Sequence, residues 1–148
     1  MLKKGIVFIS ISLCIFLVGF IVKEALYQPQ LKTNIKIEES EGDFNVHITV
    51  EKTQDGFQIL RSLEYRGDEG IQISHRTPLI EVMINKNNPE FTGSPVNRQL
   101  IPGSHYHPQG PLKFDDIGEG IHDIYVHAQF ETADEKIDIQ TTGQIEIN

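Results

Sequence analysis

An uncharged apolar run near the amino terminus constrains this chain more than any other feature of its sequence. The run covers Gly5–Val22, follows Lys3 and Lys4, and ends at Lys23. As an α-helix, these residues span about 27 Å, close to the hydrocarbon thickness of a bilayer. The run has no polar face, unlike a helix on the surface of a soluble domain. We therefore predict a transmembrane helix over residues 5–22.

The lysines beside the run orient the predicted helix. Because positively charged flanks stay in the cytoplasm, we expect residues 1–4 there and the rest of the chain outside the cytoplasm. Candidate signal-peptide cleavage sites have Leu17 or Lys23 at position −3, where a small residue is needed. A retained signal-anchor is therefore favoured, and cleavage is the alternative. The only cysteine, Cys14, lies inside the run, so no disulfide is expected beyond it.

A polar stalk over residues 23–33 is predicted to lead into one domain over residues 34–148. That domain has about 115 residues, enough for a single compact core. Residues 24–148 hold 10 basic and 21 acidic side chains, a net charge of −11. Such an excess of acid repels phosphate backbones and anionic lipid headgroups. Nucleic-acid binding is therefore not expected, and cations or basic partners are favoured.

Beyond the stalk, apolar and polar residues alternate with a period of two. The segment Asp43–Lys52 has apolar residues at every second position, the pattern of a strand with one face in water. Gln54-Asp55-Gly56 predicts a tight hairpin after it. Further strands are predicted at residues 33–39, 57–65, 71–75, 79–86, 96–101, 121–130 and 136–148. These short strands predict an all-β fold, an antiparallel immunoglobulin-like β-sandwich, with a small barrel as the alternative.

The order of four segments within residues 57–131 carries a resemblance. The segments are LEYRGDEGIQISH, PLIEVMI, Leu100-Ile101-Pro102-Gly103-Ser104 and GIHDIYVHAQFE. In this order they resemble small Ig-like domains of Gram-positive bacteria related to the intracellular proteinase inhibitor family. The resemblance implies a sandwich fold and protease inhibition through an exposed loop. This chain departs from that family by its apolar run and by having no tryptophan.

Histidine is the most suggestive polar residue type for a metal site. His105 and His107 flank Tyr106, and in an extended chain their imidazoles point to the same side. Paired imidazoles at this spacing can hold Zn²⁺ or Cu²⁺, with His122 or Asp123 as a third ligand. A metal-binding module is therefore an alternative function, and no other cofactor is predicted. Other histidines divide by parity: His47 and His127 fall on water-facing positions, whereas His75 and His122 share the parity of apolar neighbours.

The sequence contains no recognisable catalytic constellation. Ser74-His75 and Ser104-His105 are adjacent pairs, and neighbours on a strand point to opposite faces. No nucleophile-elbow, zinc-protease or phosphate-loop motif occurs. We therefore predict that the chain is not an enzyme.

Two long connections, at residues 87–95 and 104–120, are the predicted working surfaces. Loops at the end of a rigid sandwich are where such folds bind. We predict that the anchored domain binds or assists another protein of the cell envelope through these connections. The side chains expected to make contact are Glu90, Phe91, Tyr106, Phe114, Asp115 and Asp116.

Overall fold

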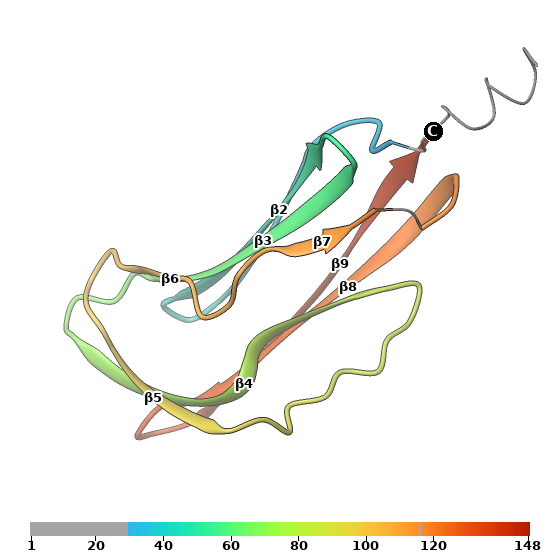
Figure 1. The fold of residues 1–148 in the computed structure, drawn as a ribbon. Helices are drawn as coiled ribbons and strands as arrows, with labels where there is room; N and C mark the ends of the chain where they lie inside the picture. Colours follow the sequence, from blue (N-terminus) through green and yellow to red (C-terminus); the bar gives the residue numbers. More distant parts are fainter. Residues whose placement is uncertain (1–29, 116) are drawn as a thin grey trace, which may run out of the picture.

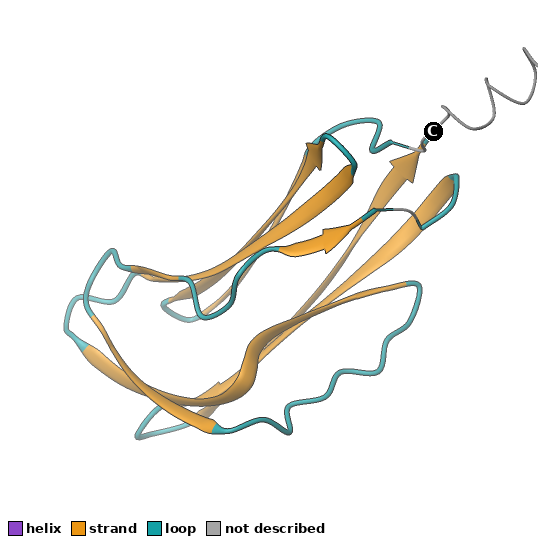
Figure 2. Cartoon of the chain, in the orientation of Figure 1, coloured by secondary structure: helices purple, strands orange, loops and turns teal. Residues whose placement is uncertain are grey.

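The structure is a computed structural model that describes residues 30–115 and 117–148. Within these residues, nine strands form two antiparallel sheets that face each other (Figures 1 and 2). The predicted all-β sandwich is therefore confirmed. The predicted transmembrane helix over residues 5–22 lies outside the described residues. Among the residues that are described, no helix is long and apolar enough to cross a membrane.

The two sheets are built mainly from hairpins. The first sheet has the order β1-β2-β3, and two short strands, β6 and β7, pair with the free side of β3. The second sheet has the order β5-β4-β8-β9. The strands are β1 (Ile35–Glu41), β2 (Phe44–Thr53), β3 (Gly56–Tyr65), β4 (Ile71–Ile84), β5 (Pro95–Leu100), β6 (His105–Tyr106), β7 (Leu112–Phe114), β8 (Gly120–Glu131) and β9 (Lys136–Ile147).

Alternation along each strand places one face of each sheet in a shared core. On β9 the four isoleucines predicted to share one face are all buried, each at most 4% exposed. They are Ile137, Ile139, Ile145 and Ile147. On β8 the inward set ends at Phe130, whose ring meets that of Phe44 in the opposite sheet at a centroid distance of 4.8 Å. Burial of these apolar faces is the main favourable term in folding.

One strand, β4, replaces two that the sequence predicts at residues 71–75 and 79–86. Its pairing with β8 changes register between His75 and Ile80, and the Thr77–Pro78 peptide bond is cis. The register changes by an odd number of residues, so the inward side chains switch from odd positions, such as Ile73, to even ones. This β-bulge lets both halves of β4 face the core.

Arg61 closes the open edge between the two sheets. It lies in β3 between the stretches that pair with β7 and with β6, and it is only 8% exposed. Its guanidinium donates hydrogen bonds to the carbonyl of Ile80 in β4 at 3.3 Å and to that of Gly110 at 2.8 Å. The side chain of Gln109 also bonds to the backbone N–H and carbonyl of Ile80. The connection around residues 109–110 is thereby tied to both sheets.

The sandwich has two distinct ends, here called the base and the tip. At the base, Gln30 and Asn148 exchange backbone hydrogen bonds of 2.9 and 3.0 Å, so the two ends of the described chain lie together. The tip consists of four turns at residues 42–43, 66–70, 101–104 and 132–135. In Figure 1 the base lies at the upper right, beside the C-terminus, and the tip at the lower left. The twelve residues of β9 separate them by about 40 Å.

Replacing Arg61 with alanine tests whether its guanidinium holds this edge together. We expect Arg61→Ala to lower the free energy of unfolding by about 2 to 5 kcal/mol, because two carbonyl groups lose a donor and a cavity is left. Urea denaturation of the full-length chain, followed by circular dichroism, measures this. Arg98→Ala is the control: Arg98 is exposed and lies over the Tyr106 ring, so its loss should cost less than about 1 kcal/mol. Equal losses in the two variants would contradict the role of Arg61.

Candidate interaction surfaces

A groove at the tip is lined by both apolar and acidic side chains. It has a volume of about 320 Å³ and lies between turns of the two sheets. Its floor is apolar and largely buried, and its rim carries exposed carboxylates. The floor residues are Phe44, Tyr65, Ile71 and Ile137, and the acidic rim residues are Glu41, Asp43, Asp134 and Glu135. The groove is therefore suited to a ligand that is partly apolar and positively charged.

Negative charge dominates the tip. Counted with the residues directly beside them, three of the tip turns cover residues 41–43, 66–71 and 131–136. These residues hold seven carboxylates and two basic side chains, a local net charge of −5. One of the two basic groups, Arg66, is already paired with Glu64 at 2.7 Å. The four rim carboxylates form no ion pair with any residue that the structure describes. Their charges are therefore available to a partner.

The pKa of Tyr65 is affected by the carboxylates around the groove. Burial raises the pKa of the Tyr65 hydroxyl, and the nearby charges of Asp43, Asp68 and Glu69 raise it further. The hydroxyl donates a hydrogen bond of 2.7 Å to the backbone carbonyl of Glu69. The phenol ring thus lies fixed in the groove, among carboxylates from two different turns.

Exposed apolar surface is also present at the tip. Among the described residues, two large hydrophobic side chains are exposed: Ile101 at 63% and Ile121 at 69%. Ile101 belongs to the tip turn between β5 and β6, whereas Ile121 lies near the base, where it pairs with Glu146. The two isoleucines therefore offer a matched comparison between the two ends.

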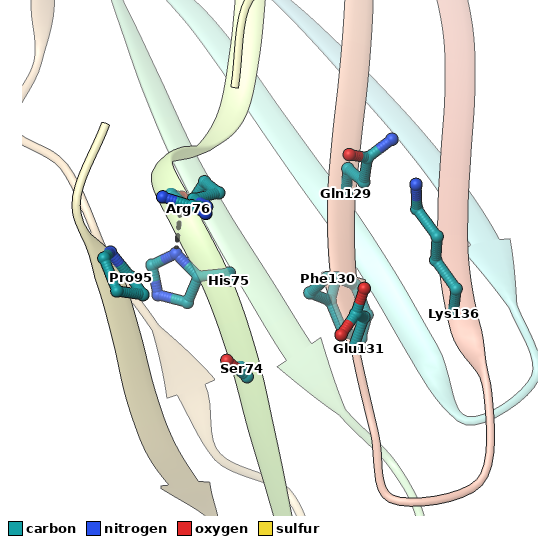
Figure 3. A pocket seen from close by; sticks show the side chains of 8 residues that line it. All are labelled: Ser74, His75, Arg76, Pro95, Gln129, Phe130, Glu131 and Lys136. Carbon is teal, nitrogen blue, oxygen red and sulfur yellow. Dashed lines mark hydrogen bonds between the residues drawn. The ribbon is translucent and has the colours of Figure 1, made fainter. Parts of the chain in front are cut away.

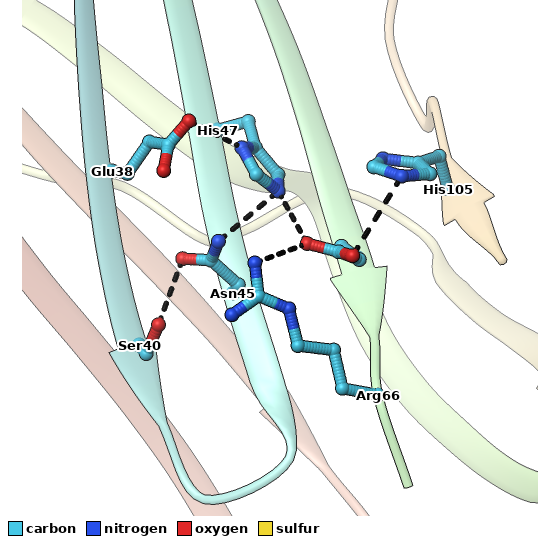
Figure 4. Close-up of polar contacts among 7 residues, drawn as sticks. Glu38, Ser40, Asn45, His47, Arg66 and His105 are labelled. Atoms are coloured by element: carbon cyan, nitrogen blue, oxygen red, sulfur yellow. Dashed lines mark hydrogen bonds and ion pairs between the residues drawn. The ribbon is translucent and has the colours of Figure 1, made fainter. Parts of the chain in front are cut away.

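A polar network centred on Glu64 covers part of the outer face of the first sheet (Figure 4). One carboxylate oxygen of Glu64 is 2.7 Å from Nε2 of His47 and 2.7 Å from Nη2 of Arg66. The other oxygen is 3.8 Å from Nε2 of His105, and His47 also contacts Glu38 at 3.1 Å. Hydrogen bonds from Arg66 and His47 lower the pKa of Glu64 to about 2. This network joins β1, β2, β3 and β6, so its evident role is to fasten the sheet.

The structure does not assemble the predicted metal site. His105 lies in the Glu64 network, and His107 is exposed just beyond β6. His122 is in the other sheet, 8% exposed, and its ring nitrogens bond to Asn85 and to the carbonyl of Gly118, each at 2.9 Å. No group of three or more His, Cys, Asp or Glu residues in the described part of the chain is arranged to hold a metal ion.

The parity of the histidines is as the sequence predicts. His75 and His122 are buried, and both ring nitrogens of each have polar partners. His47 and His127 point outward and contact carboxylates of neighbouring strands. The histidines in the described strands thus act as structural hydrogen-bonding groups.

The aromatic side chains predicted to make contacts pack against the body of the domain. Phe114 stacks on Phe57 with ring centroids 5.0 Å apart. Tyr106 is hydrogen-bonded to His75 at 3.1 Å, and Phe91 lies edge-on to His127 at 5.1 Å. Glu90 and Asp115 are exposed, and Asp116 lies outside the described residues.

The two long connections run along the side of the sandwich, which differs from the expectation that they lie at one end. The connection at residues 87–95 follows the base end of β4 and returns to Pro95, which pairs with Arg76. The connection at residues 104–120 starts at the tip and reaches the base, where Phe114 pairs with Phe57. The physical reason is the open edge between the sheets, which the second connection covers.

A second cavity lies at the bulge of β4 (Figure 3). It has a volume of about 240 Å³ and is lined by residues of β4, β5, β8 and β9. Arg76, Lys136 and Glu131 all face it, so charges of both signs share one site. The charges of this cavity therefore favour neither an anionic nor a cationic ligand, whereas the charged residues of the tip groove are all acidic.

Together these features define a β-sandwich domain with two different ends. The ends of the described chain lie at one of them, and an acidic, partly apolar groove lies at the other. The chain matches no model of a known protein family and no curated protein. Sequence reasoning missed the groove because its lining comes from three turns far apart in the chain. The available signal was the run of acidic residues in those turns.

Replacing Glu64 with glutamine tests the network through its pH dependence. The folded-state pKa of Glu64 is lowered from 4.5 to about 2, so its contribution to stability is complete above about pH 5 and is lost as the pH falls toward 2. We expect Glu64→Gln to lower the melting temperature at pH 7, with a difference from wild type that shrinks between about pH 5 and pH 2. Calorimetry across this pH range measures it. Glu119→Gln, an exposed control, should have little effect, and a pH-independent difference for Glu64→Gln would contradict the assignment.

Proposed function

We propose that the chain is a single-pass membrane protein whose β-sandwich lies outside the cytoplasm and binds another protein of the cell envelope. The lysine-flanked apolar run at residues 5–22 has the length to span a bilayer. The observation that supports the proposal most is that the chain enters the domain at the base, whereas the groove lies at the opposite end. A chain arriving from the anchor meets the domain at the base, beside Asn148, and the groove is presented about 40 Å away.

The tip supports binding better than the long connections do. Its apolar floor residues and rim carboxylates line the groove, and Ile101 is exposed to solvent. In contrast, Tyr106 and Phe114 of the second connection are already packed on the core. Protein interfaces place buried apolar anchors within a polar rim, and the tip has both elements.

We also propose that the strand order is immunoglobulin-like. Such sandwiches pair strands A, B and E in one sheet and C, F and G in the other. Taking β2 as A, β3 as B, β4 as C, β6 with β7 as E, β8 as F and β9 as G gives this order, with β5 beside β4 and with β1 as an additional strand. The order supports the resemblance to the proteinase inhibitor family. Protease inhibition through residues 87–90, which are exposed except for the half-buried Pro89, is therefore the second candidate function.

The anchor is tested by deleting residues 5–22. We expect the full-length chain to sediment with membranes and to resist extraction at alkaline pH, because a membrane-spanning helix is inserted almost irreversibly. The deletion variant should remain in the soluble fraction. Fractionation followed by immunoblotting measures both chains. A full-length chain found in the soluble cytosolic fraction would contradict the proposal.

Binding at the tip is tested by site-specific photo-crosslinking in the cells that produce the chain. A photoreactive amino acid at Ile101 should give a crosslinked adduct with an envelope protein, whereas the same amino acid at Ile121 should not. Both positions are similarly exposed, so accessibility alone does not separate them. Adducts at neither position, or at Ile121 alone, would contradict tip binding, and an adduct at residues 87–90 with a protease would favour inhibition.

A further inference from the structure

We propose that the tip groove binds a basic segment of the partner protein, with a lysine or arginine side chain seated between the rim carboxylates and an apolar residue against Ile101. This inference rests on the proposed function, because it names the chemistry of the partner that the tip would bind. Three features carry it: the apolar floor, the unpaired rim charges and the exposed isoleucine.

The composition of the groove matches the two parts of a long basic side chain. Lysine and arginine bury their methylene stems on apolar surface while the charged head stays at a polar boundary. Phe44, Tyr65, Ile71 and Ile137 supply apolar surface at the floor, and the carboxylates stand above it. A short acidic or purely apolar side chain would leave one of these two surfaces unmatched.

The charges of the rim select the sign of the occupant. Asp43 comes from the turn between β1 and β2, and Glu135 from the turn between β8 and β9, so carboxylates of both sheets flank the groove. They have no cationic partner among the described residues. The rim therefore attracts a basic partner and repels an acidic one.

Other occupants fit the tip less well. Two copies meeting tip to tip would bring two surfaces of local charge −5 together, which electrostatics opposes. A small cation would satisfy the rim carboxylates but would leave Ile101 exposed to water. A basic protein segment satisfies both at once.

Binding of a defined basic peptide to the full-length chain in nanodiscs of zwitterionic lipid tests the inference. The probe is a fluorescently labelled peptide of lysines with one central leucine, and empty nanodiscs supply the blank. We expect saturable binding by fluorescence anisotropy that weakens as salt is added, because salt screens surface charge pairs. The same peptide with glutamates in place of lysines should not bind.

Matched variants locate the peptide on the protein. The tip variant combines Asp43→Asn with Glu135→Gln, and the control combines Asp55→Asn with Glu119→Gln, which lie in exposed turns at the base. Both lose the same two charges. We expect the tip variant to weaken binding about five- to tenfold, about 0.5 to 0.7 kcal/mol for each charge pair, and the control to stay within about twofold. Ile101→Ser should weaken binding about threefold or more, with Ile121→Ser unchanged.

Several outcomes would overturn the inference. Equal weakening by the tip and base variants would show that net charge alone attracts the peptide. Displacement of the peptide by millimolar Ca²⁺ together with no effect of Ile101→Ser would assign the carboxylates to a cation. A dimer that dissociates only in the tip variant, seen by sedimentation, would assign the tip to a second copy. If Ile101 crosslinks an envelope protein and the basic peptide does not compete, the chemistry is wrong while the proposed function stands.

Discussion

The hydrogen bonds of one buried charged side chain, Arg61, hold β4 and the connection around Gly110 together along the open edge of the sandwich. The bulge in β4 and the break between β6 and β7 face each other across this edge, and each leaves backbone groups that no strand neighbour satisfies. An apolar side chain at this position would fill space but could not donate to the carbonyls of Ile80 and Gly110. The guanidinium does both, because it is planar and carries several donors.

This interaction also decides which surfaces are left for binding. Because Arg61 and Gln109 tie the connection at residues 104–120 to β4, that connection is part of the wall of the sandwich. Its aromatic residues, Tyr106 and Phe114, pack against the core and are partly buried. The short turns at the tip do not cover an open edge, and most of their side chains are exposed. Length of a loop is therefore a poor guide to its availability in this domain.

The alternation of residue types was sufficient to predict most of the strands, because a strand with one wet face repeats every two residues. The isoleucines of β9 and the Asp55-Gly56 turn are direct examples. The continuity of β4 could not be predicted, since Pro78 interrupts it and the inward parity changes at the bulge. The short strands β6 and β7 were missed because two- and three-residue pairings leave no periodic signal.

The candidate site was harder to predict than the fold, because alternation assigns a side chain to a face but not to a neighbour. The Glu64 network depends on register: His47 lies opposite Ser62 and His105 opposite Glu64, which only the pairing of β2, β3 and β6 determines. The tip groove depends on which turns share one end of the sandwich. Asp43 and Glu135 are more than ninety residues apart in the chain, and only the stacking of the two sheets places them on one groove.

The negative charge of the tip acts over a short range in solution. The tip has a local net charge of −5. The Debye length at physiological salt is about 8 Å, far shorter than the length of about 40 Å that separates the two ends. In the proposed membrane arrangement, the charge of the lipid surface is therefore screened before it reaches the tip. The field of the tip in turn acts mainly on groups within about 8 Å, so in the proposed arrangement it discriminates among partners that already lie beside the groove.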